Sequence, residues 1–293
     1  MTAPVGHRSI GQPREPAFWL FAAFVAYGAV RLVEALSGIA GIAPSAWAAT
    51  GVLLALYAAP AAVLVVELDL YEREPVSLAF GAFAWGAFAA TALALDASGW
   101  DAVVAELFGA DVAARWGPAI TAPLVEETLK GAGVVLLYLI ARDEVDDVMD
   151  GFVYGALCGL GFAVVEDVVF FAAAFGGSAA DVLDGFAVRV IAGGLYGHVL
   201  YTGLVGMAIA EVVTRRHDRP LRRRLALAAA LAAAGVAGHA LWNSPILASL
   251  APSPPIEGLE RVRWLLVVLL RTAPLLGVVV LAVGLARRRE RRW

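Results

Sequence analysis

Long apolar stretches constrain this chain more than any other feature of its sequence. Windows of about 19 residues place eight of them near residues 17–37, 47–67, 78–98, 119–141, 150–175, 187–213, 225–247 and 263–285. Each stretch is long enough to cross the hydrocarbon core of a bilayer as a helix, which takes about 20 residues. We therefore expect an all-α polytopic membrane protein, a bundle of about eight transmembrane helices.

The composition agrees with a chain whose solvent is largely lipid. Hydrophobic residues make up 61% of the 293 positions and charged residues only 16%. Eight spans of about 20 residues leave short loops, which excludes a large aqueous catalytic module. The sequence also offers no basic soluble platform of the kind that binds nucleic acid, so we expect no nucleic-acid partner.

Arginine residues gather on one side of the predicted spans. If the N-terminus is inside, the inner segments carry 15 arginines, whereas the outer loops carry Arg115 and Arg261, with Arg263 at a span edge. Because cations near span ends are retained in the cytoplasm, both termini are predicted to be cytoplasmic in a multi-pass protein of the cell membrane. The expected organisation is a cytoplasmic segment 1–16, one transmembrane domain 17–285 and an Arg-rich cytoplasmic tail 286–293.

Charged and histidine side chains inside four neighbouring spans need an explanation, because one charge at the centre of a membrane helix costs about 2.5 to 3.5 kcal/mol. Taken singly, each polar residue is also compatible with a simple role in joining helices. Together they indicate a functional site. The residues are Glu126, Glu127 and Lys130 in the fourth span, Glu166 and Asp167 in the fifth, His198 and Thr202 in the sixth, and His239 and Asn243 in the seventh.

The depth of these residues supports a common site. Counted from the outer ends of their spans, Glu126, Glu166, His198 and His239 lie about seven to eleven residues in, or roughly 10 to 17 Å at the helical rise. His198 is the deepest, about eleven residues into the predicted span 187–213. We expect the four side chains to converge on one water-accessible cavity.

Spacing within the fourth span predicts ion pairs on one helix. Glu126 and Glu127 precede Lys130, the only lysine of the chain, by four and three residues, so either carboxylate can reach its ammonium group. The two Glu side chains diverge by about 100° around the helix. We therefore expect one of them to face the histidines while the other pairs with Lys130.

Two imidazoles together with carboxylates suit a divalent metal ion such as zinc, and they equally suit general acid/base work on a water molecule. A proton or ion relay in a transporter is a competing function for such residues, although no pair of similarly interrupted spans announces inverted repeats. A catalytically silent membrane scaffold is a third alternative.

The order of these motifs is similar to a known pattern. Glu126-Glu127-x-x-Lys130, Phe162-x-x-x-Glu166, His198 and His239-x-x-x-Asn243, on consecutive spans, resemble the PrsW family of intramembrane proteases, which is related to the CAAX-prenyl endopeptidases and the bacteriocin-processing membrane proteases. The resemblance covers a motif-bearing core at residues 119–247. It implies an intramembrane endopeptidase that cuts a membrane-anchored protein, such as an anti-sigma-factor-like regulator, near the outer face.

The resemblance also implies roles for individual residues. The Glu126 and Glu127 pair would supply the general base, with Glu126 favoured. His198 and His239 would bind a metal ion or the reacting water, and Glu166 would be a further ligand or acid.

Asn243 would orient His239 or stabilise an oxyanion. Asp167 departs from the pattern, because an amide side chain is expected after Glu166. A carboxylate at this position does not donate the hydrogen bond that an amide could.

A further charge lies in the eighth span, outside these motifs. Arg271 sits at a depth of roughly 12 Å by the same helical rise, and a lone guanidinium there is costly. Either Arg271 extends toward the outer head groups, or it pairs with an acid of the cluster, Glu127 or Asp167, as we expect.

Overall fold

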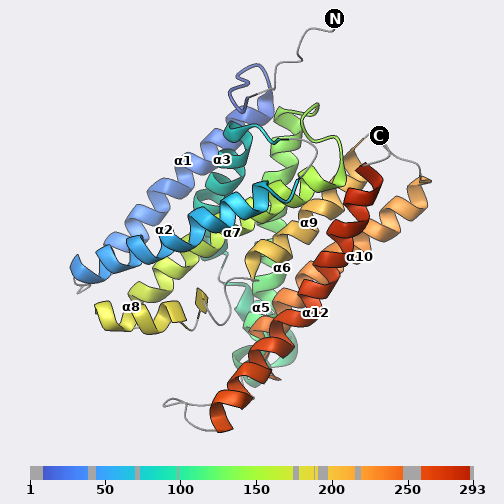
Figure 1. Cartoon of the computed structure of the whole chain (residues 1–293). Helices are drawn as coiled ribbons and strands as arrows, with labels where there is room; N and C mark the ends of the chain where they lie inside the picture. Colours follow the sequence, from blue (N-terminus) through green and yellow to red (C-terminus); the bar gives the residue numbers. More distant parts are fainter. Residues whose placement is uncertain are drawn as a thin grey trace, which may run out of the picture.

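The computed structural model describes residues 9–38, 44–69, 73–97, 99–173, 178–187, 189–190, 197–214, 219–246 and 259–290. Every regular element within these ranges is a helix, and Figure 1 shows the long helices packed side by side. The elements are α1 (Pro16–Ser37), α2 (Pro44–Val66), α3 (Val76–Ala84), the π-helical η1 (Trp85–Ala90), α4 (Thr91–Asp96), α5 (Trp100–Phe108), α6 (Ala110–Ile140), α7 (Val148–Ala173), α8 (Ala179–Phe186), α9 (His198–Val213), α10 (Leu221–Asn243) and α12 (Leu259–Glu290).

Five helical segments of the described chain are long and apolar enough to cross a membrane. They are α1, α2, the continuous stretch from α3 through α4, α7 and α10. The predicted fourth, sixth and eighth spans correspond to α6, α9 and α12, of which α9 has only 16 residues. The all-helical class is confirmed, whereas the count of eight crossings and the cytoplasmic position of both termini stay predictions.

The predicted sixth span is not one continuous helix: residues 187, 189 and 190 are π-helical, 191–196 lie outside the described residues, and Gly197 precedes a new helix. A helix is expected from residue 187, but α9 begins at His198, after Gly197 with φ −67° and ψ −115°. Gly193, Gly194 and Gly197 lower the helix propensity of the stretch before His198. The estimate that His198 lies eleven residues into a helix is therefore wrong, because His198 is the first residue of α9.

Helix α7 is the centre of the bundle. It packs against α9, η1, α3 and α2 (Figure 1), and 83% of its most apolar window is buried inside the protein. Gly151, Gly155 and Gly159 follow each other at four-residue intervals along its contact with α9. A Cβ atom at Gly155 would lie 2.3 Å from the carbonyl oxygen of Thr202. Small residues of this kind let two membrane helices approach backbone to backbone.

This close approach fixes the start of α9. A Cβ atom at Gly159 would lie 2.2 Å from the carbonyl oxygen of His198. Two of the polar residues that the sequence singles out, His198 and Thr202, are thus held on the surface of α7 by its glycines. The packing of α7 sets where their side chains can reach.

Helix α6 is fixed to the same core through the π-helical turn η1. The indole Nε1 of Trp85 donates a hydrogen bond to the carbonyl oxygen of Leu129 at 2.9 Å. On the neighbouring position, a Cβ atom at Gly86 would lie 1.8 Å from the carbonyl oxygen of Cys158 on α7. The turn therefore joins α6 to α7 next to the acidic motif of α6.

Candidate active site

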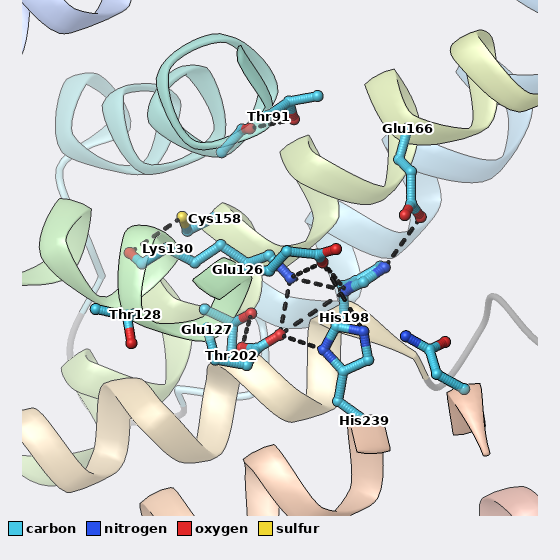
Figure 2. A network of polar contacts seen from close by, with 12 residues as sticks. Thr91, Glu126, Glu127, Thr128, Lys130, Cys158, Glu166, His198, Thr202 and His239 are labelled. Carbon is cyan, nitrogen blue, oxygen red and sulfur yellow. Dashed lines mark hydrogen bonds and ion pairs between the residues drawn. The ribbon is translucent and has the colours of Figure 1, made fainter. Parts of the chain in front are cut away.

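Four ionisable side chains from three helices meet in the interior of the bundle. Glu126 and Glu127 come from the middle of α6, His198 from the first turn of α9 and His239 from the last turn of α10. One ligand atom from each of the four lies within 4.8 Å of those of the others. Figure 2 shows the side chains pointing toward one another, with Thr202 and Lys130 beside them.

Lys130 lies at the centre of this group. Its Nζ donates to Glu126 Oε2 at 3.2 Å, Glu127 Oε1 at 2.8 Å and His198 Nδ1 at 2.8 Å (Figure 2). An ammonium group has three N–H donors, so each one has an acceptor. The Lys130 side chain is fully buried, and its Nζ lies 3.9 Å from the centre of the Phe162 ring, a favourable cation–π position.

The two glutamates differ in how firmly they are held. Glu127 Oε1 accepts from Lys130 and from His239 Nδ1 at 3.0 Å, and its Oε2 accepts from the Thr202 hydroxyl at 2.8 Å. Its side chain is 1% exposed, against 11% for Glu126. Glu126 is thus the more accessible carboxylate.

The prediction that one glutamate faces the histidines while the other pairs with Lys130 is wrong. Both carboxylates contact Lys130, and Glu126 Oε2 also lies 3.8 Å from His239 Nε2 and 3.9 Å from His198 Nδ1. The long stem of Lys130 brings its ammonium group between two carboxylates that diverge around the helix. One cation therefore serves both.

In each histidine, the ring nitrogen that points away from Glu126 contacts a carboxylate; these are called the outer nitrogens. His198 Nε2 lies 3.1 Å from Glu166 Oε2, and His239 Nδ1 lies 3.0 Å from Glu127 Oε1. An ionised carboxylate only accepts hydrogen bonds, so these two nitrogens donate. The other nitrogens, His198 Nδ1 and His239 Nε2, then carry the lone pairs, and that of His198 Nδ1 accepts from Lys130 Nζ. Carboxylate–histidine pairs of this kind orient the imidazoles of metal sites.

The donor set fits a divalent metal ion. Two imidazole nitrogens with lone pairs and two carboxylates are ligands that zinc prefers, and donors bound tetrahedrally at about 2.1 Å from one ion lie about 3.4 Å apart. The separations of Glu126 Oε2 from the two nitrogens, 3.8 and 3.9 Å, are close to that value. The Lys130 ammonium group donates to His198 Nδ1 and to both carboxylates, so it would have to move aside for an ion to bind at these donors.

The remaining predicted residues are placed around this group. Glu166 lies on the far side of the His198 ring, outside the set of four donors, so its role as a metal ligand stays a prediction (Figure 2). The Phe162 ring lies 5.0 Å from that of His198. Asn243 donates from its amide to the carbonyl oxygen of Pro118 at 3.1 Å, a different group from the imidazole that it is expected to orient.

The predicted pairing of Arg271 falls on a side chain outside the described part of the chain. The acids expected to pair with it have other cations in the structure. Glu127 contacts Lys130, and Asp167 Oδ1 contacts Arg189 Nε at 2.5 Å. Arg189 is thus one cation at Asp167, and the pairing of Arg271 stays a prediction.

Two residues of the site belong to no motif that the sequence singles out. Arg189 contacts both Glu166 and Asp167, and the Tyr201 ring stacks on His239 with the ring centres 5.0 Å apart and the planes at 12°. The sequence contains a feature that could have identified each of these two residues. Arg189 is a cation inside a predicted span, which calls for a partner, and Tyr201 lies one helical turn after His198, on the same face.

A small cavity opens beside His198. Its volume is about 30 Å³, which has room for one or two water molecules. The walls include Glu166, Arg189, His198, Tyr201 and Trp242. The cavity has room for water next to the imidazole and Glu166, whereas Glu126 is not among the residues that line it.

A second cluster of buried acids lies elsewhere in the described chain. Asp69, Glu74 and Asp150 also bring one carboxylate oxygen each within 4.8 Å of the others, and the Tyr154 hydroxyl donates to Glu74. Asp150 precedes Glu166 by 16 residues on α7, or about 24 Å at the helical rise. This cluster contains no nitrogen donor, so its chemistry differs from that of the histidine-containing group.

Comparison with known proteins agrees with the geometry. The model of the family described as PrsW family intramembrane metalloprotease matches residues 74–287. Neither the curated proteins nor the solved structures returned a match. The matched range contains the double Glu motif, Glu166 and both histidines, and it covers well over half of the chain. The chain therefore belongs to the PrsW family of intramembrane metalloproteases.

Proposed function

We propose that this protein hydrolyses a peptide bond of a membrane-anchored protein, with Glu126 as the base that activates the reacting water. One observation carries the proposal. The outer nitrogens of His198 and His239 are held by carboxylates, and their lone-pair nitrogens lie 3.9 and 3.8 Å from Glu126 Oε2. Two oriented imidazoles and an accessible carboxylate facing one point suit the activation of a water molecule.

Each residue has its own proposed role in the hydrolysis. Glu126, the more exposed carboxylate, accepts a proton from the water and passes it to the leaving amine. Glu127 holds the ring of His239 and Glu166 holds the ring of His198. Lys130 donates hydrogen bonds to both members of the glutamate pair and so fixes their positions.

A divalent ion, for which we propose zinc, would be held by His198, His239 and a carboxylate oxygen of Glu127, which leaves Glu126 as the base. Bound there, it would supply a Lewis acid for the scissile carbonyl group. The proposed substrate is a membrane-anchored regulator of the anti-sigma-factor type, cut near the outer face if the N-terminus is cytoplasmic.

Peptide cleavage by the purified full-length protein tests the proposal. In detergent, with a model transmembrane peptide, the wild type should cut and a chelator should stop it. Glu126→Gln should lower the rate by about 10²- to 10⁴-fold, the usual contribution of a general base. Glu106→Gln, at an exposed position on α5, is the matched control and should cut normally. A wild type that leaves every peptide intact, or an active Glu126→Gln variant, would overturn the proposal.

A further inference from the structure

Arg189 holds the two adjacent acids of α7 at once. It follows α8 in the chain, and its Nη2 lies 2.6 Å from Glu166 Oε2 while its Nε lies 2.5 Å from Asp167 Oδ1. The guanidinium carbon also lies 3.8 Å from the centre of the Phe170 ring. A planar group with several fixed donors and an aromatic face beneath it is confined in both position and orientation.

The oxygen that Arg189 contacts is the one that faces the histidine. Glu166 Oε2 accepts from Arg189 Nη2 at 2.6 Å and lies 3.1 Å from His198 Nε2. The position of the guanidinium therefore sets the position of the oxygen on which the ring of His198 rests. Arg189 does not contact His198 itself. It reaches the imidazole ring through Glu166 Oε2.

Asp167 acts as the second anchor of the guanidinium. Its side chain is 5% exposed, against 22% for Arg189 and 21% for Glu166. Removing one partner of a buried ion pair leaves an uncompensated charge and is strongly destabilising. Without Arg189, the adjacent carboxylates of Glu166 and Asp167 would lose the guanidinium group that both of them contact. Glu166 would then lose the contact that holds it against His198.

We infer that Arg189 is a positioning residue of the active centre, which fixes Glu166 against His198, and that Asp167 contributes by anchoring Arg189. The acidic residue at position 167, where an amide is expected, thus has a structural reason in this chain: it gives the guanidinium a second carboxylate. This inference rests on the proposed function for its effect on catalysis, but its structural content is independent of that function.

The kinetic test uses four variants of the full-length protein on a model transmembrane peptide. Arg189→Gln should lower kcat by about 10- to 100-fold, the usual cost of losing a group that orients a metal-site ligand, and leave KM unchanged. Arg189→Lys should restore only part of kcat, because an ammonium group does not offer the planar fork that spans both acids. Arg31→Gln, which removes exposed ion pairs with Glu34 on α1 and Asp96 on α4, is the matched control and should keep full activity.

The double variant Arg189→Gln with Asp167→Asn separates positioning from stability. Removing the unpaired acid should return the unfolding temperature toward that of the wild type, while kcat stays as low as in Arg189→Gln alone. A double variant that recovers kcat together with stability would mean that Arg189 only neutralises charge, and it would overturn the inference.

A structure of Arg189→Gln decides the question without any peptidase assay. The Glu166 carboxylate should leave His198 Nε2, so that the 3.1 Å contact is lost. An unchanged contact would overturn the inference even if the variant were inactive. Conversely, a wild type that cleaves no peptide would defeat the proposed function, and this structural readout would still decide the role of Arg189.

Discussion

Helices α7 and α2 have similar hydropathy, but α7 is largely buried inside the protein and α2 is largely exposed on its surface. Their most apolar windows have mean hydropathies of 1.8 and 2.2, yet 83% of the α7 window is buried inside the protein and only 22% of the α2 window. Helix α7 carries glycines that would clash with α9 if they had a Cβ atom, whereas Gly51 of α2 has open space there. Hydropathy thus finds the helices that suit a membrane, and small and ionisable residues distinguish the interior ones.

The site lies where α6, α9 and α10 meet beside α7, although the most apolar window of α10 is itself only 22% buried. Its four donors come from α6, α9 and α10, and α7 supplies Glu166 and the surface on which α9 rests. In the described part of α2, by contrast, the buried positions are apolar or small apart from Thr50 and Tyr57. Substitutions in the two regions should therefore differ sharply in their effects.

The largest effect is expected for Lys130→Met. It leaves Glu126 and Glu127 buried without the ammonium group that both contact, and breaking a buried pair in this way costs about 3 to 5 kcal/mol. Thermal unfolding in detergent should show a strongly lowered midpoint and cleavage should be lost. Arg31→Met, which removes two exposed ion pairs, should leave the midpoint nearly unchanged. Equal midpoints for the two variants would show that the interior pair is not special.

A smaller effect is expected for Gly155→Ala. The new Cβ atom would meet the Thr202 carbonyl oxygen at 2.3 Å, so α7 and α9 must separate. Overpacking of this kind costs about 1 to 3 kcal/mol, and activity should fall because α9 carries His198. The unfolding midpoint and the rate of peptide cleavage measure the two consequences. Wild-type values for both would contradict the described α7–α9 contact.

Sequence patterns predict the helices better than they predict the packing between them. The spans that became α1, α2, α7 and α10 are close to their predicted limits, because hydropathy is a local property. The start of α9 was not predictable from hydropathy, since the residues before His198 are apolar and only the glycines oppose a helix. The convergence of α6, α9 and α10 follows from motif spacing and depth, although the expected position of His198 within its helix was wrong.

Partners across helices were harder to predict than the site itself. Lys130 follows the double Glu at helical spacing, so its ion pairs are local and predictable. Arg189 lies 22 residues from Asp167, and nothing in the spacing specifies that this cation reaches the acid. Asn243 was expected beside His239 because of a four-residue step, yet its amide meets a carbonyl of α6.

The smallest effect is expected for Gly51→Ala on the peripheral helix α2. No atom lies within 4 Å of the new Cβ atom, and alanine stabilises a helix by about 0.5 to 1 kcal/mol relative to glycine. The unfolding midpoint should stay the same or rise slightly, with full peptidase activity. A clear loss of stability would mean that α2 is packed against another surface at this point, and it would weaken the comparison with α7.

The central claim is that the four-residue group of Glu126, Glu127, His198 and His239 is a metal-dependent active centre, and metal content measures it most directly. The purified wild type, supplied with Zn²⁺ and then desalted, should retain about one ion per chain, the content of a single closed site. The double variant His198→Ala with His239→Ala should retain none. Asp150→Asn, in the second acidic cluster, should retain the ion. Retention by the double histidine variant together with loss in Asp150→Asn would place the metal in the other cluster and contradict the account.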